Sequence, residues 1–233
     1  HIELARPVYH IGFIRDIKKI LECICVNCGK LKADLHDPDF KRVILSHRSD
    51  PKRRLQAVWT FCQKKKMCES DDVKEGEEED PTKQKRPSHG GCGHSQPDIR
   101  KEGLQLYLKY TKGKNEDEEM DGRVAQPEKR LFTAADCHLV FRKIPDGDLK
   151  LMGLSTKYAR PEWMILSVLP VPPPPVRPSI SVDGGVMRSE DDLTYKLTDI
   201  LKASASLRQY DTEGAPQHVL TEFENLLQYH VAT

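Results

Sequence analysis

The stretch Val168-Leu169-Pro170-Val171-Pro172-Pro173-Pro174-Pro175-Val176-Arg177-Pro178-Ser179 divides the chain into two unlike parts. Six of the nine residues from Pro170 to Pro178 are proline. Each proline fixes φ at about −65° and lacks an N–H donor, so neither a helix nor a central strand can run through the stretch. We expect an extended, stiff polyproline-type segment that joins a charged, cysteine-bearing part to two amphipathic helices.

The composition indicates a soluble chain with a large surface. Of its 233 residues, 37% are hydrophobic and 31% are charged, and the net charge is +1. The charge is unevenly placed: Lys41 to Lys66 holds nine basic residues and one acid, and Glu69 to Asp80 holds eight acids and one base. No window approaches the roughly 20 apolar residues of a membrane span, so we expect no membrane partner.

Seven cysteines in a Lys/Glu-rich chain without secretory features favour an intracellular protein with reduced thiols. The chain begins at His1 with neither an initiator Met nor a signal peptide. We therefore expect it to be part of something longer.

The motif Cys25-Val26-Asn27-Cys28-Gly29-Lys30 is the sharpest chemical signal. Two thiols separated by two residues can fold into a knuckle in which both sulfurs reach one tetrahedral metal. The other half of such a site has to come from elsewhere in the chain. The spacing favours a closed structural Zn²⁺ site made of Cys25, Cys28, Cys68 and Cys92, while Cys62, His89 and His94 stay open as replacements for one ligand.

Three other interpretations of these cysteines are weaker. A thioredoxin-type redox motif needs a βαβ context that the sequence lacks. A catalytic zinc needs an open coordination position and a nearby general base, and nothing marks one. The cysteines could also be plain unliganded thiols, as we expect for Cys137 and for Cys62 on the apolar face of a helix.

The part before the prolines predicts a mixture of short helices and strands. We expect helices beginning near residue 14 and after the caps Asp37, Asp50 and Thr133, a β-hairpin over residues 96–108, and a strand from Met164 to Leu169. The polar stretches near residues 69–88 and 112–126 are predicted to be flexible loops.

The part after the prolines predicts two helices. Apolar residues recur at spacings of three and four, the pattern of a coiled-coil seam, and Glu213-Gly214 separates the two runs. We expect an antiparallel helical hairpin. The seam residues are Leu193, Leu197, Ile200, Ser204 and Leu207 in the first helix, and Leu220, Phe223, Leu227 and His230 in the second.

Several longer strings resemble the clamp region of the largest subunit of eukaryotic RNA polymerase II, in a fungal style. The likeness runs essentially from end to end. The strings are His1-Ile2-Glu3-Leu4-Ala5-Arg6-Pro7-Val8-Tyr9-His10-Ile11-Gly12-Phe13, the Cys25-x-x-Cys28 knuckle, Gly90-Gly91-Cys92-Gly93, Arg160-Pro161-Glu162-Trp163-Met164-Ile165, Glu190-Asp191-Asp192-Leu193-Thr194 and Gln228-Tyr229-His230-Val231-Ala232-Thr233.

The resemblance implies an α+β fold: a zinc-stapled clamp head over residues 1–160, a strand, proline segment and lid-like loop over 161–190, and a clamp coiled coil over 191–233. We leave open that Thr233 cuts the second helix short. The zinc ligands that it implies agree with the four cysteines chosen from spacing. The catalytic Mg²⁺ of the polymerase, a nucleotidyltransferase, would lie outside this chain, which is expected to carry no catalytic residue itself.

The resemblance also implies partners in the nucleus: the other polymerase II subunits, especially the second-largest, template DNA and nascent RNA. Nucleic-acid contacts would fall to Arg177 and Arg188 near the lid, and to Lys52, Arg53 and Arg54 on the basic helix. A NusG-like elongation factor and general initiation factors would dock on the helical hairpin. The residues expected at its tip are Arg208, Gln209, Asp211 and Glu213. The alternative is a stand-alone structural-zinc module that binds nucleic acid.

Overall fold

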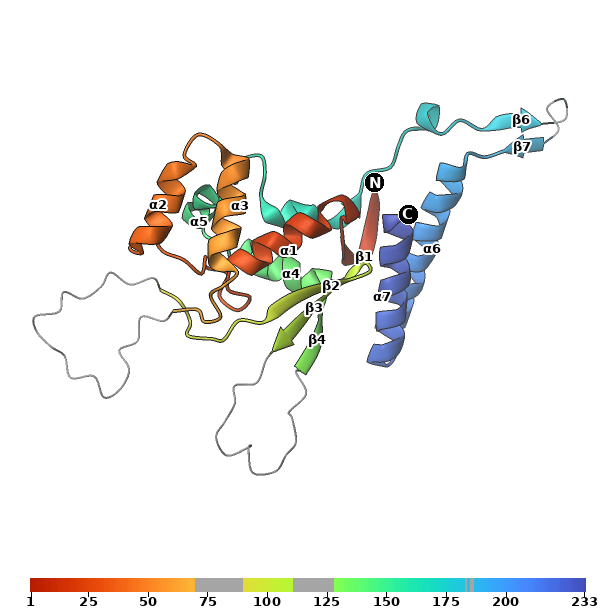
Figure 1. Ribbon diagram of the computed structural model, residues 1–233. Helices are drawn as coiled ribbons and strands as arrows, with labels where there is room; N and C mark the ends of the chain where they lie inside the picture. Colours follow the sequence, from red (N-terminus) through yellow and green to blue (C-terminus); the bar gives the residue numbers. More distant parts are fainter. Residues whose placement is uncertain (70–89, 111–127, 183, 185–186) are drawn as a thin grey trace, which may run out of the picture. The chain divides into compact units, whose positions relative to one another are not determined.

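The computed structural model describes residues 1–69, 90–110, 128–182, 184 and 187–233. These residues form a mixed α+β fold with small sheets, and they pack into two units (Figure 1). The first unit comprises residues 1–14 and 164–233, and the second comprises residues 15–163. The division by sequence at residues 160 and 190 stays a prediction. The loops predicted near residues 69–88 and 112–126 lie outside the described residues, apart from Glu69.

The first unit is built on a strand that the sequence analysis missed. Strand β1 (Ile2–Tyr9) pairs antiparallel with β5 (Ile165–Leu169), the strand predicted before the prolines. Helices α6 (Asp192–Thr212) and α7 (Gln217–Ala232) then follow as two helices that pack side by side (Figure 1). Both predicted helices are therefore confirmed, and their description as a coiled coil stays a prediction.

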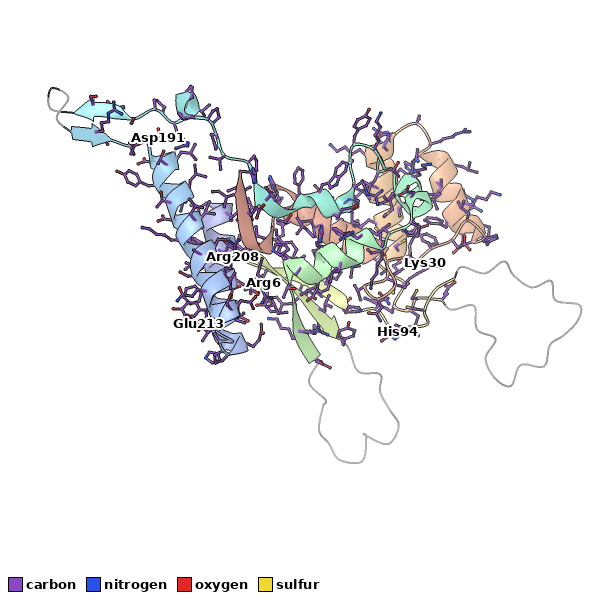
Figure 2. All side chains as sticks on the ribbon, turned by 180° about the vertical axis from the view of Figure 1, so that it is seen from behind. Arg6, Lys30, His94, Asp191, Arg208 and Glu213 are labelled. Carbon is purple, nitrogen blue, oxygen red and sulfur yellow. The ribbon has the colours of Figure 1, made fainter. Side chains whose placement is uncertain are left out.

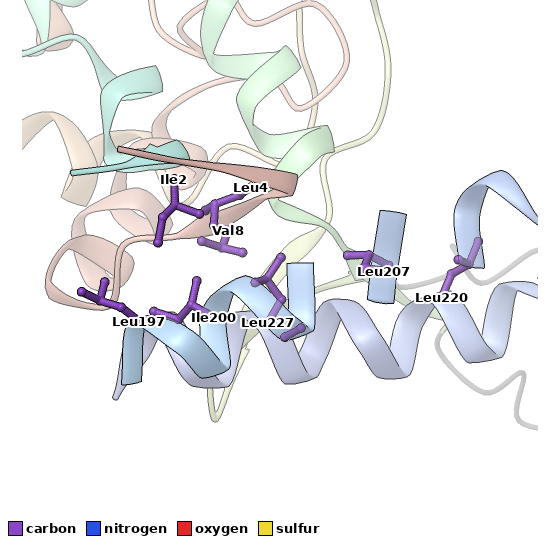
Figure 3. Packing of buried hydrophobic residues seen from close by; sticks show 9 residues of the cluster. Ile2, Leu4, Val8, Leu197, Ile200, Leu207, Leu220 and Leu227 are labelled. Atoms are coloured by element: carbon purple, nitrogen blue, oxygen red, sulfur yellow. The ribbon is translucent and has the colours of Figure 1, made fainter. Parts of the chain in front are cut away.

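The core of the first unit joins the two ends of the chain. Side chains of β1 pack with those of α6 and α7 in one apolar cluster (Figure 3). Burying each Leu or Ile contributes about 1.5–3 kcal/mol, so this cluster fixes the helices to the strand. Because β1 covers the helices, burial departs from the predicted seam, and Leu193 of that seam is exposed. The cluster comprises Ile2, Leu4, Val8, Leu197, Ile200, Ala203, Leu207, Leu220 and Leu227.

Polar side chains of the helices complete the second edge of β1. Gln228 Oε1 accepts a hydrogen bond from the Tyr9 N–H at 2.7 Å, and Gln228 Nε2 donates to the Tyr9 carbonyl at 3.0 Å. Ser204 Oγ accepts from the Ala5 N–H at 2.9 Å. Buried backbone groups need such partners, and an edge strand left open invites pairing with other chains. The buried Gln228 and Ser204 therefore replace a neighbouring strand.

The proline stretch differs in one respect from the extended segment expected. Pro173 is extended, with φ −69° and ψ 159°, but Pro174–Val176 form a single 3₁₀ turn. The N–H groups of Val176 and Arg177 donate to the carbonyls of Pro173 and Pro174 at 3.0 and 3.1 Å. The cause is that the last prolines are followed by residues with N–H donors, and the fixed proline φ suits a 3₁₀ turn. Strands β6 (Ile180–Val182) and β7 (Met187–Ser189) follow.

The second unit contains the predicted helices α1 (Ile14–Cys23), α2 (Pro38–Ser46), α3 (Pro51–Cys62) and α4 (Ala134–Arg142), with a short α5 (Asp146–Leu151). The predicted caps are confirmed: Asp37, Asp50 and Thr133 each accept a hydrogen bond from a backbone N–H in the first turn. The helices bury a core that includes Ile17, Ile20, Leu21, Phe40, Val58, Phe141, Leu149 and Met152.

A three-stranded antiparallel sheet completes the second unit. Strands β2 (Asp98–Glu102) and β3 (Gln105–Tyr110) form the predicted hairpin, with Gly103 at φ 57° in the turn. Strand β4 (Glu128–Phe132), which the sequence analysis missed, adds to β3. None of the described helices combines the length and apolar content needed to cross a membrane.

Candidate metal centre

The first knuckle follows directly from the end of α1. Ile24 and Leu31 form an isolated antiparallel bridge, and the Cys25 N–H donates to the Lys30 carbonyl at 2.8 Å. The bridge closes a tight turn that holds Cys25 and Cys28 on one side. Within the turn, the N–H groups of Asn27 and Cys28 point at Cys25 Sγ, at 3.4 and 3.5 Å. Such donors are typical of a knuckle that presents thiolates to a metal.

The second knuckle has the same arrangement, but a longer segment of chain separates its two cysteines. Met67 and Ser95 form the isolated bridge, and the Cys68 N–H donates to the His94 carbonyl at 3.0 Å. The Cys92 N–H points at Cys68 Sγ at 3.4 Å. Gly91 allows this approach, because a Cβ there would lie 1.9 Å from the Glu69 carbonyl oxygen. Lys30 and His94 mark the two knuckles in Figure 2.

The structure brings the four predicted cysteines together. The sulfur atoms of Cys25, Cys28, Cys68 and Cys92 all lie within 4.8 Å of one another. The Cys25 and Cys92 sulfurs are 3.5 Å apart, and those of Cys28 and Cys68 are 3.8 Å apart. Zn–S bonds of about 2.3 Å in a tetrahedron place sulfurs about 3.8 Å apart. The donor set therefore fits a metal ion such as zinc, with four protein ligands.

The pKa values of the thiols reflect their burial and the short distances between the four sulfur atoms. Burial raises the pKa of the Cys25 thiol, but hydrogen bonds from the N–H groups of Cys28 and Asn27 and from the thiols of Cys92 and Cys28 together lower this pKa below its ordinary value. Burial dominates at Cys28 and Cys68, and the pKa of each thiol is raised, that of Cys68 most strongly. Adjacent thiolates repel one another, so four of them need a cation to neutralise them.

Gln96 supports the centre, and the sequence analysis did not single it out. Its side chain is buried, and Nε2 donates to Cys25 Sγ at 3.2 Å and to the His94 carbonyl at 2.9 Å. Its Oε1 accepts from the Val26 N–H at 3.0 Å. One amide therefore links the two knuckles and donates to a ligand sulfur, as residues around metal ligands commonly do. No motif marks this role, because it depends on two segments meeting in space.

A family model decides the relationship of the chain to known proteins. The model of RNA polymerase Rpb1, domain 1, matches residues 1–233. The chain belongs to this family. Rpb1 is the largest subunit of DNA-directed RNA polymerase, a nucleotidyltransferase. Membership therefore makes the chain a segment of that subunit and implies other polymerase subunits and nucleic acid as partners.

Among the described residues of this Rpb1 domain, the other candidate ligands lie outside the cysteine cluster. Cys62 is fully buried on α3 and hydrogen-bonds with the Cys23 thiol, which raises the pKa of Cys23. Cys137 is buried within α4. His94 is exposed, and its Nδ1 lies 2.9 Å from the Cys92 carbonyl oxygen. His89 lies outside the described residues.

The five predicted nucleic-acid residues of the Rpb1 domain fall into two classes. Lys52 and Arg53 are exposed on α3, and Arg188 is exposed on β7. Arg54, in contrast, donates to the carbonyls of His47, Arg48 and Lys150. Arg177 donates to the Pro172 carbonyl at 2.9 Å and to Thr194 Oγ1 at 3.3 Å, which fastens the proline turn to α6.

The four predicted docking residues lie at the last turns of α6, where Figure 2 labels Arg208 and Glu213. Two of them contact β1: Arg208 donates to the Glu3 carbonyl at 3.2 Å, and Asp211 lies 2.7 Å from the Arg6 guanidinium. Gln209 Nε2 donates to Glu213 Oε1 at 2.8 Å, and both residues are exposed. Gln209 and Glu213 therefore stay the more accessible pair.

Proposed function

We propose that this chain is the clamp region of the largest subunit of RNA polymerase II, acting in the nucleus. The clamp would close over DNA and the RNA–DNA hybrid during transcription. The observation that carries the proposal is the convergence of four thiols from two knuckles in a chain that matches domain 1 of Rpb1 throughout. The match over the whole chain does not favour the alternative of a stand-alone zinc module.

In this proposal the metal is a structural zinc. Cys25, Cys28, Cys68 and Cys92 supply four thiolates, which leaves no open position for a substrate or water. The zinc would supply no chemistry beyond joining the two knuckles and neutralising their charge. The Mg²⁺ that serves catalysis belongs to the parent enzyme, outside this chain.

The clamp role can be tested in the assembled polymerase. A fluorophore on this domain and another on the second-largest subunit report their separation by energy transfer. We expect the separation to shorten when a DNA–RNA scaffold is added, and to respond less in a Cys25→Ser enzyme. An unchanged separation on scaffold binding would overturn the clamp proposal while leaving the family assignment intact.

Nucleic-acid contact in the clamp would fall to the exposed cations Lys52, Arg53 and Arg188. Cations of this kind bind phosphate without reading sequence. In the lid-like loop, Val176 to Asp191, Arg188 would assist the separation of transcript from template. We expect Arg188→Glu to lengthen the hybrid trapped in the enzyme. The matched variant Arg177→Glu would instead loosen the proline turn, because Arg177 already bonds to Pro172 and Thr194.

The pair α6–α7 would be the clamp coiled coil, on which a NusG-like elongation factor and general initiation factors dock. Gln209 and Glu213 are the accessible members of the tip, whereas Arg208 and Asp211 also contact β1. We expect Glu213→Lys to weaken factor binding without lowering thermal stability. Undiminished binding by the Glu213→Lys enzyme would remove the docking role from this tip.

A further inference from the structure

Helix α3 has two apolar faces. Val58 and Cys62 share the first face and are fully buried. A second face carries Ala57, Thr60 and Phe61, and Lys64 continues its spacing of three and four residues just past the end of the helix. A surface helix that packs only against the core of its own unit needs one apolar stripe. The second stripe of α3 is therefore available to a binding partner. Together with Val43 of α2 and Lys65, this stripe lines a groove of about 550 Å³.

The floor of this α2–α3 groove is held in place from below. The Phe61 ring lies 5.3 Å from the ring of Phe40, which is fully buried. One wall is held by Lys65, whose Nζ lies 3.6 Å from Asp37 and 3.3 Å from Glu69. A pre-formed floor and a fixed wall reduce the ordering cost that a binding partner has to overcome.

The charge around the groove is mainly positive, although Lys65 is paired with Asp37 and Glu69. Helices α2 and α3 contain five Lys or Arg residues and one acid, Asp39. Arg53 lies on the groove stripe, four residues before Ala57, and Lys64 lies at its other end. In the described part of the chain, the exposed Lys41 and Lys64 make no ion pair. A partner with negative charge is therefore favoured.

The lining decides the class of this partner. A phosphate backbone would use the cations and leave the apolar floor of Ala57 and Phe61 in contact with water. An amphipathic helix uses both, because its apolar side chains fill the groove at helical spacing while its acidic residues meet the cations on the rim. We propose that the α2–α3 groove docks an acidic amphipathic helix of another protein. This site shares Arg53 with the nucleic-acid contacts proposed for the clamp, and it is separate from the proposed factor contacts on α6 and α7.

The test is a selection with a random peptide library displayed on phage, using the zinc-loaded chain and its Thr60→Arg variant. Thr60 is exposed on the groove floor, so an arginine there covers the floor, and arginine is the better helix former. The enriched peptides should be acidic, with apolar residues at helical spacing. Measured by fluorescence anisotropy, they should bind Thr60→Arg at least about tenfold more weakly than the unaltered chain.

Comparing variants of different charge separates the contribution of the groove floor from that of the cations on the rim. Thr60→Arg adds a cation, so weaker binding of an acidic peptide would show that the peptide occupies the groove. Lys64→Glu should weaken binding about threefold to tenfold, and Lys157→Glu, an exposed charge reversal outside the groove lining, should leave it unchanged. The proposal is overturned if no peptide is enriched, if the enriched peptides are basic or bind Thr60→Arg equally well, or if duplex DNA binds in a way that Thr60→Arg abolishes.

Discussion

The first unit and the metal centre of the second unit join distant parts of the chain by different means. In the first unit, β1 meets α6 and α7 through nine buried apolar residues and through hydrogen bonds from side chains to the backbone. At the metal centre, two short knuckles meet through four thiols and one amide. The first arrangement depends on packing, and the second, in the zinc site that we propose, depends on a cation. The two parts should therefore respond differently to the same treatment.

Loss of zinc should have the largest effect. Structural zinc contributes on the order of 10–16 kcal/mol of apparent binding free energy, which exceeds the stability of many domains. In Cys25→Ser we expect the zinc to be lost and the second unit to unfold, with loss of amide exchange protection around both knuckles. The amides of β1, α6 and α7 should keep their protection, because their cluster contains no ligand.

Native mass spectrometry would count the metal, and we expect one zinc per chain. Cys23→Ser is the matched control, since Cys23 is buried two residues away and its thiol donates to the Lys19 carbonyl at 3.2 Å, as a hydroxyl can. A Cys25→Ser chain that stays folded and keeps its zinc would show that the ligand assignment is wrong.

The next largest effect should be confined to the first unit. Gln228→Leu removes the side-chain amide that bonds to both the N–H and the carbonyl of Tyr9. Each buried hydrogen bond lost in this way costs about 1–3 kcal/mol, so the free energy of unfolding should fall by about 2–6 kcal/mol. Urea unfolding measures this fall, and the zinc content should not change. Gln217→Leu makes the same change at an exposed position and should cost little.

Much of the cysteine cluster and several of the helices could be predicted from the sequence. The knuckle Cys25-x-x-Cys28 and the glycines around Cys92 are local patterns, and the four cysteines chosen from spacing are the ones that the structure brings together. The caps Asp37, Asp50 and Thr133 are equally local, and they mark helices that the structure contains.

What the sequence could not show depends on partners far along the chain. β1 becomes a strand because β5 and the helices satisfy its two edges, more than 150 residues later. Gln228 looks like a surface residue until Tyr9 is placed beside it. Arg54 and Arg177 look like free cations, and only the folded chain supplies the carbonyls that they bind.

A smaller effect is expected from Gln96→Leu, which should lower the affinity for zinc without unfolding the chain. Gln96→Leu removes the donor to Cys25 Sγ and the link between the knuckles. Loss of such a supporting residue typically lowers metal affinity about 10–100-fold. Competition with a chelator measures the affinity, and the stability of the first unit should not change. Gln56→Leu, at an exposed position on α3, should bind zinc as the unaltered chain does.

The smallest effect should come from the charged contacts of the first unit. Arg6 lies 2.7 Å from Asp211 and 3.2 Å from Glu224, with about a third of its side chain exposed. Exposed ion pairs contribute about 0–1 kcal/mol and weaken with salt. Arg6→Met should therefore lower the free energy of urea unfolding by less than about 1 kcal/mol, and by still less in 1 M salt. Arg208→Met removes a bond to a neutral carbonyl, so its effect should not depend on salt in this way. If Arg6→Met cost as much as Gln228→Leu, charge rather than packing and neutral hydrogen bonds would hold the helices to β1.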